Sequence, residues 1–243
     1  MSLQVCAFYC TDTGQRPRNE DAVGLSLPGE PELSARGMIA AIADGVSGSA
    51  DGREAAEYAV HAVLLDHDAR ASEGVAVIPA LDESFQTIHR ALRERNALRA
   101  ESVGIATTLT ALVIQGPTYY FCHVGDTRLY RLRRDDLELL TTDHVADGAS
   151  NKHVLTRAIG QNSAITVDHG AGDLRRGDIF LLASDGIWSV LPEHEISWHL
   201  SELIGDKRSA EGTARLLVDA ALAAGSTDNL SALVVRIDQL PDQ

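Results

Sequence analysis

Two Asp-Gly pairs in this sequence each follow a short apolar run. Asp44 and Gly45 follow the run at 38–43, and Asp185 begins the second pair after the run at 179–183. Short, bounded apolar runs predict buried strands, and a buried strand tolerates an unpaired charge only at its end. Two such strands can bring two carboxylates to one place, where a hard divalent cation would bind them. An Asp-Gly pair also forms ordinary turns, and for either pair alone that explanation serves as well.

Further polar residues extend this candidate site. Asp228 stands where a Gly, Ser and Thr-containing loop enters the last apolar run. Arg16 lies in a polar loop with Glu20 and Asp21, and its planar guanidinium suits an oxyanion such as phosphate. For the residues of this loop alone, a solvated loop is the favoured explanation.

The donor set predicts the metal and the reaction. Asp44, Asp185, Asp228 and the carbonyl of Gly45 offer oxygen alone, which favours Mg²⁺ or Mn²⁺ over zinc. Two such ions about 3.5–4 Å apart, sharing one carboxylate, can hold a bridging water as a nucleophile. With an arginine on the phosphate, these parts predict hydrolysis of a phosphoester by in-line attack, without a covalent enzyme intermediate.

Composition narrows the class of protein. The 243 residues are compatible with one large domain over 1–243, and no internal repeat or linker divides them. The net charge is 21 − 35 = −14, which argues against non-specific nucleic-acid binding. Three cysteines, Cys6, Cys10 and Cys122, make no disulfide framework and favour a reducing compartment. Zinc binding by Cys6 and Cys10 lacks a second pair of ligands. Without a signal peptide or membrane-length run, we expect a cytoplasmic protein.

The apolar periodicity predicts strands, a helix pair, more strands and a second helix pair, an order typical of α+β proteins. Expected strands cover 3–9, 22–27, 38–43, 107–114, 118–124, 127–133, 137–141, 164–168, 178–183 and 230–237. Expected helices cover 51–66, a segment from Pro79, 196–203 and 214–221, and 28–37 should be a loop. The turns within 107–141 predict one antiparallel meander, with a hairpin corner at Gly125-Asp126.

Several other side chains have ordinary explanations. Trp188 should be part of the core, and His144 and His153 should lie at the surface or behind a ligand shell. The second helix carries a group of arginines that should form a solvated face paired with nearby acids, Arg90, Arg93, Arg95 and Arg99.

Taken in order, eight short motifs resemble the metal-dependent serine/threonine phosphatases of type 2C, and most closely their bacterial branch. The motifs are Gly14-x-Arg16-x-x-Asn19-Glu20-Asp21, Asp44-Gly45-Val46-Ser47-Gly48, Ala106-Thr107-Thr108, Val124-Gly125-Asp126-Thr127-Arg128, Thr141-Thr142-Asp143-His144, Leu155-Thr156-Arg157-Ala158-Ile159-Gly160, Ser184-Asp185-Gly186-Ile187-Trp188 and Asp228-Asn229-Leu230. Each is weak alone, but together they cover nearly the whole chain in the order of the family.

The resemblance implies a four-layer α-β-β-α sandwich of two antiparallel sheets flanked by helix pairs, with two core Mn²⁺ or Mg²⁺ ions at one end. It implies that Asp44 bridges both ions, that Gly45 binds one through its carbonyl, and that Asp185 and Asp228 hold the other. Arg16 would grip the substrate phosphate, Asp126 would help a weaker third ion, and the supporting residues would be Glu20, Asp21 and Asn229.

Three positions depart from the family pattern. Val46 stands where some members have a histidine proposed as general acid, so the leaving group must take its proton from water or another group. Ser189 stands where some members have a further aspartate, which would weaken one metal site. The segment 145–154 is shorter than the mobile flap of many bacterial members, which predicts a more open cleft and weaker binding of the third ion.

By this resemblance the chain is a monomeric phosphatase that removes phosphate from phosphoserine and phosphothreonine in proteins and so opposes a bacterial serine/threonine kinase. Two alternatives stay open. The same fold with a decayed metal site could bind phosphopeptides as a regulator without turnover. An intact site could instead hydrolyse small phosphoesters.

Overall fold

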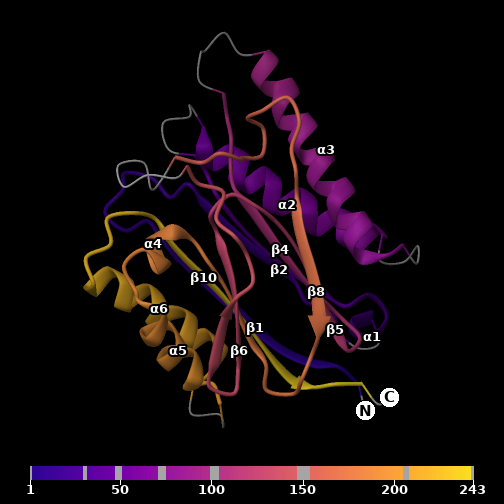
Figure 1. Cartoon of the computed structure of the whole chain (residues 1–243), viewed down its shortest axis with the longest axis vertical. Helices are drawn as coiled ribbons and strands as arrows, with labels where there is room; N and C mark the ends of the chain where they lie inside the picture. The colour runs from indigo at the N-terminus through magenta and orange to yellow at the C-terminus, as the bar shows by residue number, and fades with distance from the viewer. Residues whose placement is uncertain are drawn as a thin grey trace.

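Two five-stranded antiparallel sheets form the centre of the molecule (Figure 1). The computed structural model describes residues 2–29, 32–46, 51–70, 75–98, 104–146, 154–204 and 208–241. Ser47, Gly48, Arg99, His153 and most of the segment 145–154 lie outside these ranges. One sheet has the order β1-β10-β9-β6-β7 and the other β2-β3-β4-β5-β8. The strands are β1 Gln4–Asp12, β2 Asp21–Ser26, β3 Met38–Asp44, β4 Leu109–Gln115, β5 Thr118–Val124, β6 Arg128–Arg133, β7 Asp136–Leu139, β8 Asp168–Asp173, β9 Ile179–Ala183 and β10 Leu230–Gln239.

Helices cover the outer face of each sheet (Figure 1). The long helices α2 (Gly52–Arg70) and α3 (Val77–Ala97) pack on the sheet of β2 and β3. The other sheet is covered by α4 (Asp185–Trp188), α5 (Glu193–Ser201) and α6 (Ala210–Ala223), and a short α1 (Glu32–Arg36) contacts β4. The α+β class and the four-layer sandwich are therefore confirmed.

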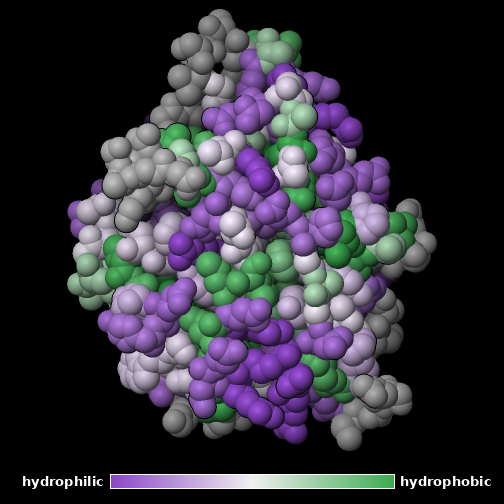
Figure 2. Space-filling model, viewed as in Figure 1, coloured by the Kyte–Doolittle hydropathy of each residue, from purple (hydrophilic) through white to green (hydrophobic). Residues whose placement is uncertain are grey.

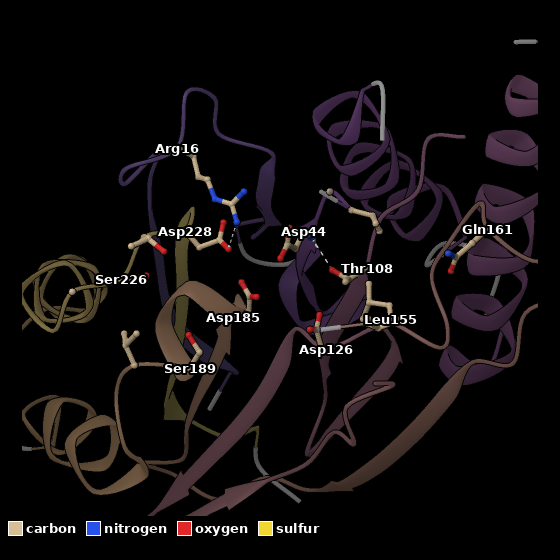
Figure 3. A pocket seen from close by; sticks show the side chains of 16 residues that line it. Arg16, Asp44, Thr108, Asp126, Leu155, Gln161, Asp185, Ser189, Ser226 and Asp228 are labelled. Carbon is tan, nitrogen blue, oxygen red and sulfur yellow. Dashed lines mark hydrogen bonds and ion pairs between the residues drawn. The ribbon is translucent and has the colours of Figure 1, made fainter. Parts of the chain in front are cut away.

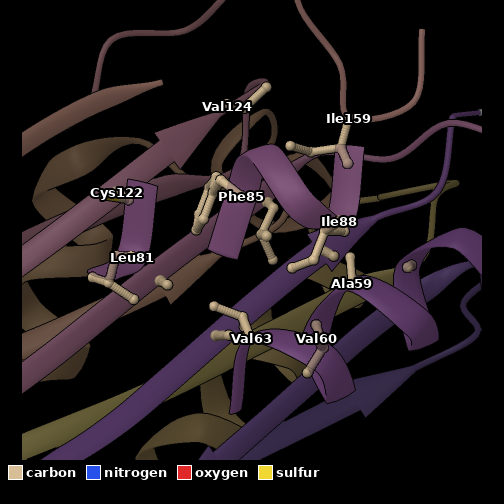
Figure 4. Close-up of a cluster of buried hydrophobic side chains, with 14 of the residues drawn as sticks. Ala59, Val60, Val63, Leu81, Phe85, Ile88, Cys122, Val124 and Ile159 are labelled. Carbon is tan, nitrogen blue, oxygen red and sulfur yellow. The ribbon is translucent and has the colours of Figure 1, made fainter. Parts of the chain in front are cut away.

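Three buried clusters hold the four layers together. One joins α2 and α3 to their sheet around Phe85 (Figure 4), and a second joins α5 and α6 to theirs. The third lies between the sheets and includes Met38, Ala40, Ile42, Phe180 and Leu182. Because side chains alternate along a strand, β3 sends its odd-numbered residues to the helices and its even-numbered residues to the other sheet. Both faces are buried, which is why the run reads as continuously apolar.

The predicted meander is wrong. Strands β4 and β5 pair in one sheet, whereas β6 and β7 pair in the other. The next neighbour of β5 is β8, and that of β6 is β9. Gly125-Asp126 is therefore a crossover between sheets and no hairpin. Turn spacing cannot distinguish the two, because which sheet accepts the next strand depends on residues far along the chain.

Other local predictions need correction. The expected loop at 28–37 contains α1, and the expected strand at 164–168 lies instead at β8. Ile165 and Val167 pack against the α2–α3 cluster as part of a loop. Strand β8 contains Gly170 and Gly172, where any Cβ would collide with the rings of Phe121 and Tyr119 on β5. The aromatic side chains of β5 thus supply the packing that the β8 sequence lacks.

The helices begin and end within a few residues of expectation, with α2 reaching Arg70 and α3 beginning at Val77 ahead of Pro79. The prediction for the arginine face holds for Arg95, which pairs with Glu54 at 3.1 Å. Arg90 Nη2 instead donates to Thr87 Oγ1 and Arg93 Nη1 to Ser163 O, both at 3.0 Å. Trp188 is half-buried and stacks beneath the guanidinium of Arg128, 3.7 Å from the ring centre.

The polar character of the face in Figure 2 agrees with the charged composition of the chain. Charged and polar side chains surround smaller apolar patches on the face in Figure 2. All three cysteines are free, and Cys6 and Cys10 pack against the α5–α6 cluster. The two ends of the chain meet because β1 pairs with β10 (Figure 1). Within the described ranges, no helix has the length and apolar character needed to cross a membrane.

Candidate active site

Hydrogen bonds to two threonines hold the backbone of Asp44 at the end of β3. Its N–H donates to Thr108 Oγ1 at 2.7 Å, and its carbonyl accepts from Thr107 Oγ1 and from Thr108 N, both at 2.9 Å. Asp44 also continues the even-numbered set of β3, which faces the other sheet. These restraints direct the carboxylate into the space between the two sheets (Figure 3). The two threonines belong to a motif noted in the sequence, but nothing there indicated this role.

Gly45 sits where no larger residue fits. A Cβ at this position would collide with the backbone of Gly52, the first residue of α2. Its N–H donates to Glu20 O at 3.1 Å, which fixes the backbone at Gly45. The absence of a side chain lets the chain turn tightly beside Asp44.

Asp185 and Asp228 come from the opposite sheet. Asp185 is the first residue of α4, directly after β9 and Ser184. Gly186 packs so closely beneath the carbonyl of Asn229 that a Cβ would collide with it. The Asp228 carboxylate accepts from Asn229 N at 2.9 Å and from Arg16 Nη2 at 2.7 Å. Two segments more than 40 residues apart in sequence therefore meet at one end of the sandwich.

One cavity of about 640 Å³ collects these side chains (Figure 3). Its lining includes the residues predicted for the site, namely Arg16, Asp44, Gly45, Asp126, Asp185 and Asp228. Val154, Leu155 and Val190 add apolar side chains to the lining, and Ser189 also faces the cavity. A volume of this size lies in the range of pockets that hold small molecules or side chains.

The carboxylates raise one another's pKa. Burial raises the pKa of Asp44 well above its usual value, and the charges of Asp21 and Asp185 raise it further. Burial likewise raises the pKa of Asp126 to about 7, with a further contribution from Asp185. Like charges gathered in a partly buried space are costly unless a cation neutralises them.

The three supporting residues lie behind the cavity. Asp21 is opposite Asp44 in the β2–β3 pair and is 7% exposed. Its Oδ2 accepts from Ser184 Oγ at 2.7 Å, whereas its buried Oδ1 has no hydrogen-bond partner. Burial raises the pKa of Asp21 to about 7. An unpartnered carboxylate oxygen in this position fits a role in binding a water of a hydrated cation.

Asn229 ties the loops together. Its Oδ1 accepts from Glu20 N at 2.8 Å, and its Nδ2 donates to Thr13 O and Arg18 O, both at 2.9 Å. This side chain therefore joins the Arg16 loop to the start of β10. Glu20 contributes its backbone to the same arrangement, through the bonds to Asn229 and Gly45.

The donor set fits a hard divalent cation, although the carboxylates are spread around the cavity. Across the described ranges, no three Asp, Glu, His or Cys side chains are gathered tightly enough to enclose an ion. Asp228 instead holds Arg16, and Asp44, Asp126 and Asp185 line the same cavity. The chemistry of the lining, with carboxylates and a backbone carbonyl, is nevertheless that of a Mg²⁺ or Mn²⁺ site.

Comparison with known proteins agrees with the fold and with this chemistry. The family model described as "Protein phosphatase 2C" matches residues 16–225. The serine/threonine phosphatase stp of Listeria innocua is 28% identical over 249 residues, covering 94% of each chain.

Two solved structures extend the likeness to the whole fold. The catalytic domain of the phosphatase PstP in complex with two manganese ions matches with a TM-score of 0.83 and 25% identity, covering 98% of this chain and 100% of that one. The phosphatase MsPP of Mycobacterium smegmatis, in complex with cacodylate, matches with a TM-score of 0.78 and 28% identity, covering 99% and 100%.

A sandwich of this topology with an acidic cavity at one end defines a metal-dependent phosphatase. The chain belongs to the protein phosphatase 2C family and is, as the sequence predicts, a protein-serine/threonine phosphatase.

Proposed function

We propose that the chain hydrolyses phosphoserine and phosphothreonine in proteins with a binuclear Mn²⁺ or Mg²⁺ centre. The observation that supports this most is the convergence of Asp44, Asp126, Asp185 and Asp228 with Arg16 on one cavity. When bound, the ions supply an activated water and neutralise the charge of the phosphate. The two manganese ions of the PstP complex support the number, and the 28% identical relative supports the substrate class.

Within this proposal each residue has a role set by its position. The carboxylates of Asp44, Asp185 and Asp228 and the carbonyl of Gly45 would hold the two ions, with Asp44 shared between them. Arg16 moves from Asp228 onto the phosphate oxygens, since a guanidinium fork fits a phosphate as well as a carboxylate. Asp126 would hold a third, weaker ion. Asp21, Glu20 and Asn229 would act from behind the cavity, by fixing waters and loops.

The proton for the leaving group comes from water or a carboxyl group in this proposal. Val46 lines the cavity where some relatives have a histidine, and no histidine is among the described residues of the lining. Val154 and Leu155 line the cavity at the end of the short segment 145–154. The shortness of that segment in the sequence supports a cleft open to protein substrates.

The proposal extends to the cellular setting. The chain forms one catalytic domain over 1–243, acts as a cytoplasmic monomer, and opposes a serine/threonine kinase. Its net charge of −14 supports protein over nucleic acid as partner. Light scattering of the purified protein tests the monomer, and a kinase gene next to the phosphatase gene would support the pairing.

Phosphate release from a phosphothreonine peptide, with Mn²⁺ and then with EDTA, tests the function. We expect turnover that EDTA abolishes and that Asp185→Ala lacks. No release by the manganese-loaded protein would support the regulator alternative. Faster turnover of small phosphoesters than of several phosphopeptides would support the metabolite hydrolase.

A further inference from the structure

The backbone of the Gly125-Asp126 crossover is held from two sides by His144. The amide of Gly125 donates to His144 Nδ1 at 3.0 Å, and the amide of His144 donates to Gly125 O at 2.7 Å. Gly125 O belongs to the same peptide group as the amide of Asp126. His144 is only 5% exposed, so solvent does not replace these bonds easily.

These contacts define the tautomer of His144. An amide can only donate, so Nδ1 must accept and the proton must lie on Nε2. Nε2 then donates to Asp168 Oδ2 at 3.1 Å. Arg157 Nη1 donates to Asp168 Oδ1 at 2.7 Å and also lies 3.1 Å from Nε2, a contact that is no hydrogen bond in this tautomer because both groups are donors. The ring of His123 packs against that of His144, with their centres 4.8 Å apart. The imidazole is therefore fixed at both nitrogens and on one face.

The corner itself has little freedom to find another position. Gly125 has a φ of +116°, and a Cβ there would meet Thr108 closely. Thr108 in turn binds the backbone of Asp44. Because the crossover and β3 touch at this residue, a displaced Gly125 would shift the carboxylate of Asp126 relative to that of Asp44.

The backbone around His144 also bonds to the segment that forms part of the cavity wall. The carbonyl of His144 accepts from Thr156 N at 2.8 Å, and Ala146 N donates to Val154 O at 2.9 Å. Val154 and the neighbouring Leu155 both line the cavity. One buried residue thus joins the crossover that bears Asp126 to the segment that carries Val154 and Leu155.

We propose that His144 is a positioning residue that aims Asp126 into the cavity through the hydrogen bond from Gly125 N to Nδ1. The inference rests on the proposed metal-binding role of Asp126. His144 contacts no substrate atom and transfers no proton. It acts as residues behind a ligand shell do, by fixing the orientation of a ligand.

Two substitutions separate the proposed bond from the general packing of the ring. In His144→Asn, the side-chain oxygen lies near the position of Nδ1 and can accept from Gly125. In His144→Gln, the amide lies near the position of Nε2, so the bond to Asp168 is kept and that from Gly125 is lost. The measurement is Mn²⁺ binding by titration calorimetry, with free Mn²⁺ counted by electron paramagnetic resonance, on the full chain.

We expect Asp126→Asn to remove the weakest class of Mn²⁺ sites, and His144→Gln to weaken the same class about 10–100-fold. We expect His144→Asn to stay within about threefold of wild type, as for a kept hydrogen bond to a fixed ligand. Equal affinities in His144→Gln and wild type would overturn the inference, as would a His144→Asn variant as weak as His144→Gln. If Asp126→Asn binds Mn²⁺ like wild type while the core sites stay intact, the assignment of Asp126 fails, and the inference with it. Loss of all Mn²⁺ binding in wild type would instead contradict the proposed function.

A measurement on wild type guards against a variant that does not fold. In ¹⁵N-labelled, Mg²⁺-loaded protein, we expect the Nε2-protonated tautomer of His144 and a scalar coupling between Gly125 N and His144 Nδ1. A proton on Nδ1 would exclude the proposed bond and overturn the inference.

Discussion

Strand β9 runs between two aspartates in opposite electrostatic surroundings. Asp178 precedes the strand and is 1% exposed, yet each of its oxygens is satisfied. Oδ1 accepts from Arg133 Nε at 2.8 Å, and Oδ2 accepts from Arg133 Nη2 at 2.6 Å and Arg175 N at 2.7 Å. Asp185 follows the strand and faces the cavity with Asp44 and Asp126.

The contrast shows how one residue type serves two purposes. At the Asp178 end a guanidinium fork neutralises the buried charge, and the pair joins β6 to the start of β9. At the cavity end, burial and neighbouring carboxylates raise the pKa of Asp44 and Asp126. The first arrangement stabilises the fold without further help. The second is destabilising in the protein alone, and in the proposed function a bound cation would make it favourable.

The largest effect should come from Asp44→Asn. Because Asp44 is proposed to bridge both ions, we expect kcat on a phosphothreonine peptide to fall about 10³-fold, equivalent to about 4 kcal/mol. Asp178→Asn, at the other end of the sandwich, should leave kcat of the folded protein within about twofold. An Asp44→Asn variant with more than about a tenth of wild-type kcat would contradict the bridging role.

The two substitutions should affect stability in the opposite order, with Asp178→Asn the more destabilising. Asp178→Asn leaves Arg133 without its charged partner, and we expect the free energy of unfolding to fall by about 3 kcal/mol. In metal-free buffer, Asp44→Asn should be as stable as wild type or more so, because it removes one of several repelling charges. Urea unfolding of both variants checks this. Equal losses in the two variants would remove the distinction between the two ends.

Mn²⁺ should stabilise the folded protein only through the carboxylates at the cavity end of the sandwich. At about a hundred times its dissociation constant, Mn²⁺ should add about 2.7 kcal/mol to the free energy of unfolding. Wild type and Asp178→Asn should gain alike, whereas Asp44→Asn should gain far less. Thermal unfolding with Mn²⁺ or EDTA measures the gain. An Asp44→Asn variant stabilised as strongly as wild type would place the ions elsewhere.

The smallest effect should be a gain of affinity. Ser189 lines the cavity after α4, and Ser189→Asp adds a carboxylate facing the existing ones. We expect Mn²⁺ to bind about tenfold more tightly, or about 1.4 kcal/mol. Ser189→Asn, with similar shape and no charge, is the control and should change little. Unchanged affinity in Ser189→Asp would mean that this position lies too far from the ions to act as a ligand.

The sequence predicted the chemistry through local patterns. Runs such as 38–43 and 179–183 end in Asp-Gly because a buried strand can place a charge only where it leaves the core. The order of strands and helix pairs follows from apolar periodicity, which is a property of neighbouring residues. These rules sufficed for the α+β class and for Asp44, Asp185 and Asp228 as candidate site residues. The sandwich and the role of Asp126 followed only from the resemblance, and Gln161 and Ser226 in the cavity lining were not predicted.

Tertiary structure decided what depends on residues far apart. It divided the expected meander between two sheets and placed a strand at the glycines of β8, where rings on β5 supply the missing packing. It gave Asp178 an arginine and Asp185 a cavity, although the two stand at opposite ends of one strand. It also joined His144 to Gly125, 19 residues away. The partner of a buried polar group depends on which segments meet in three dimensions. Periodicity along the chain reports only neighbouring residues, so it cannot predict that partner.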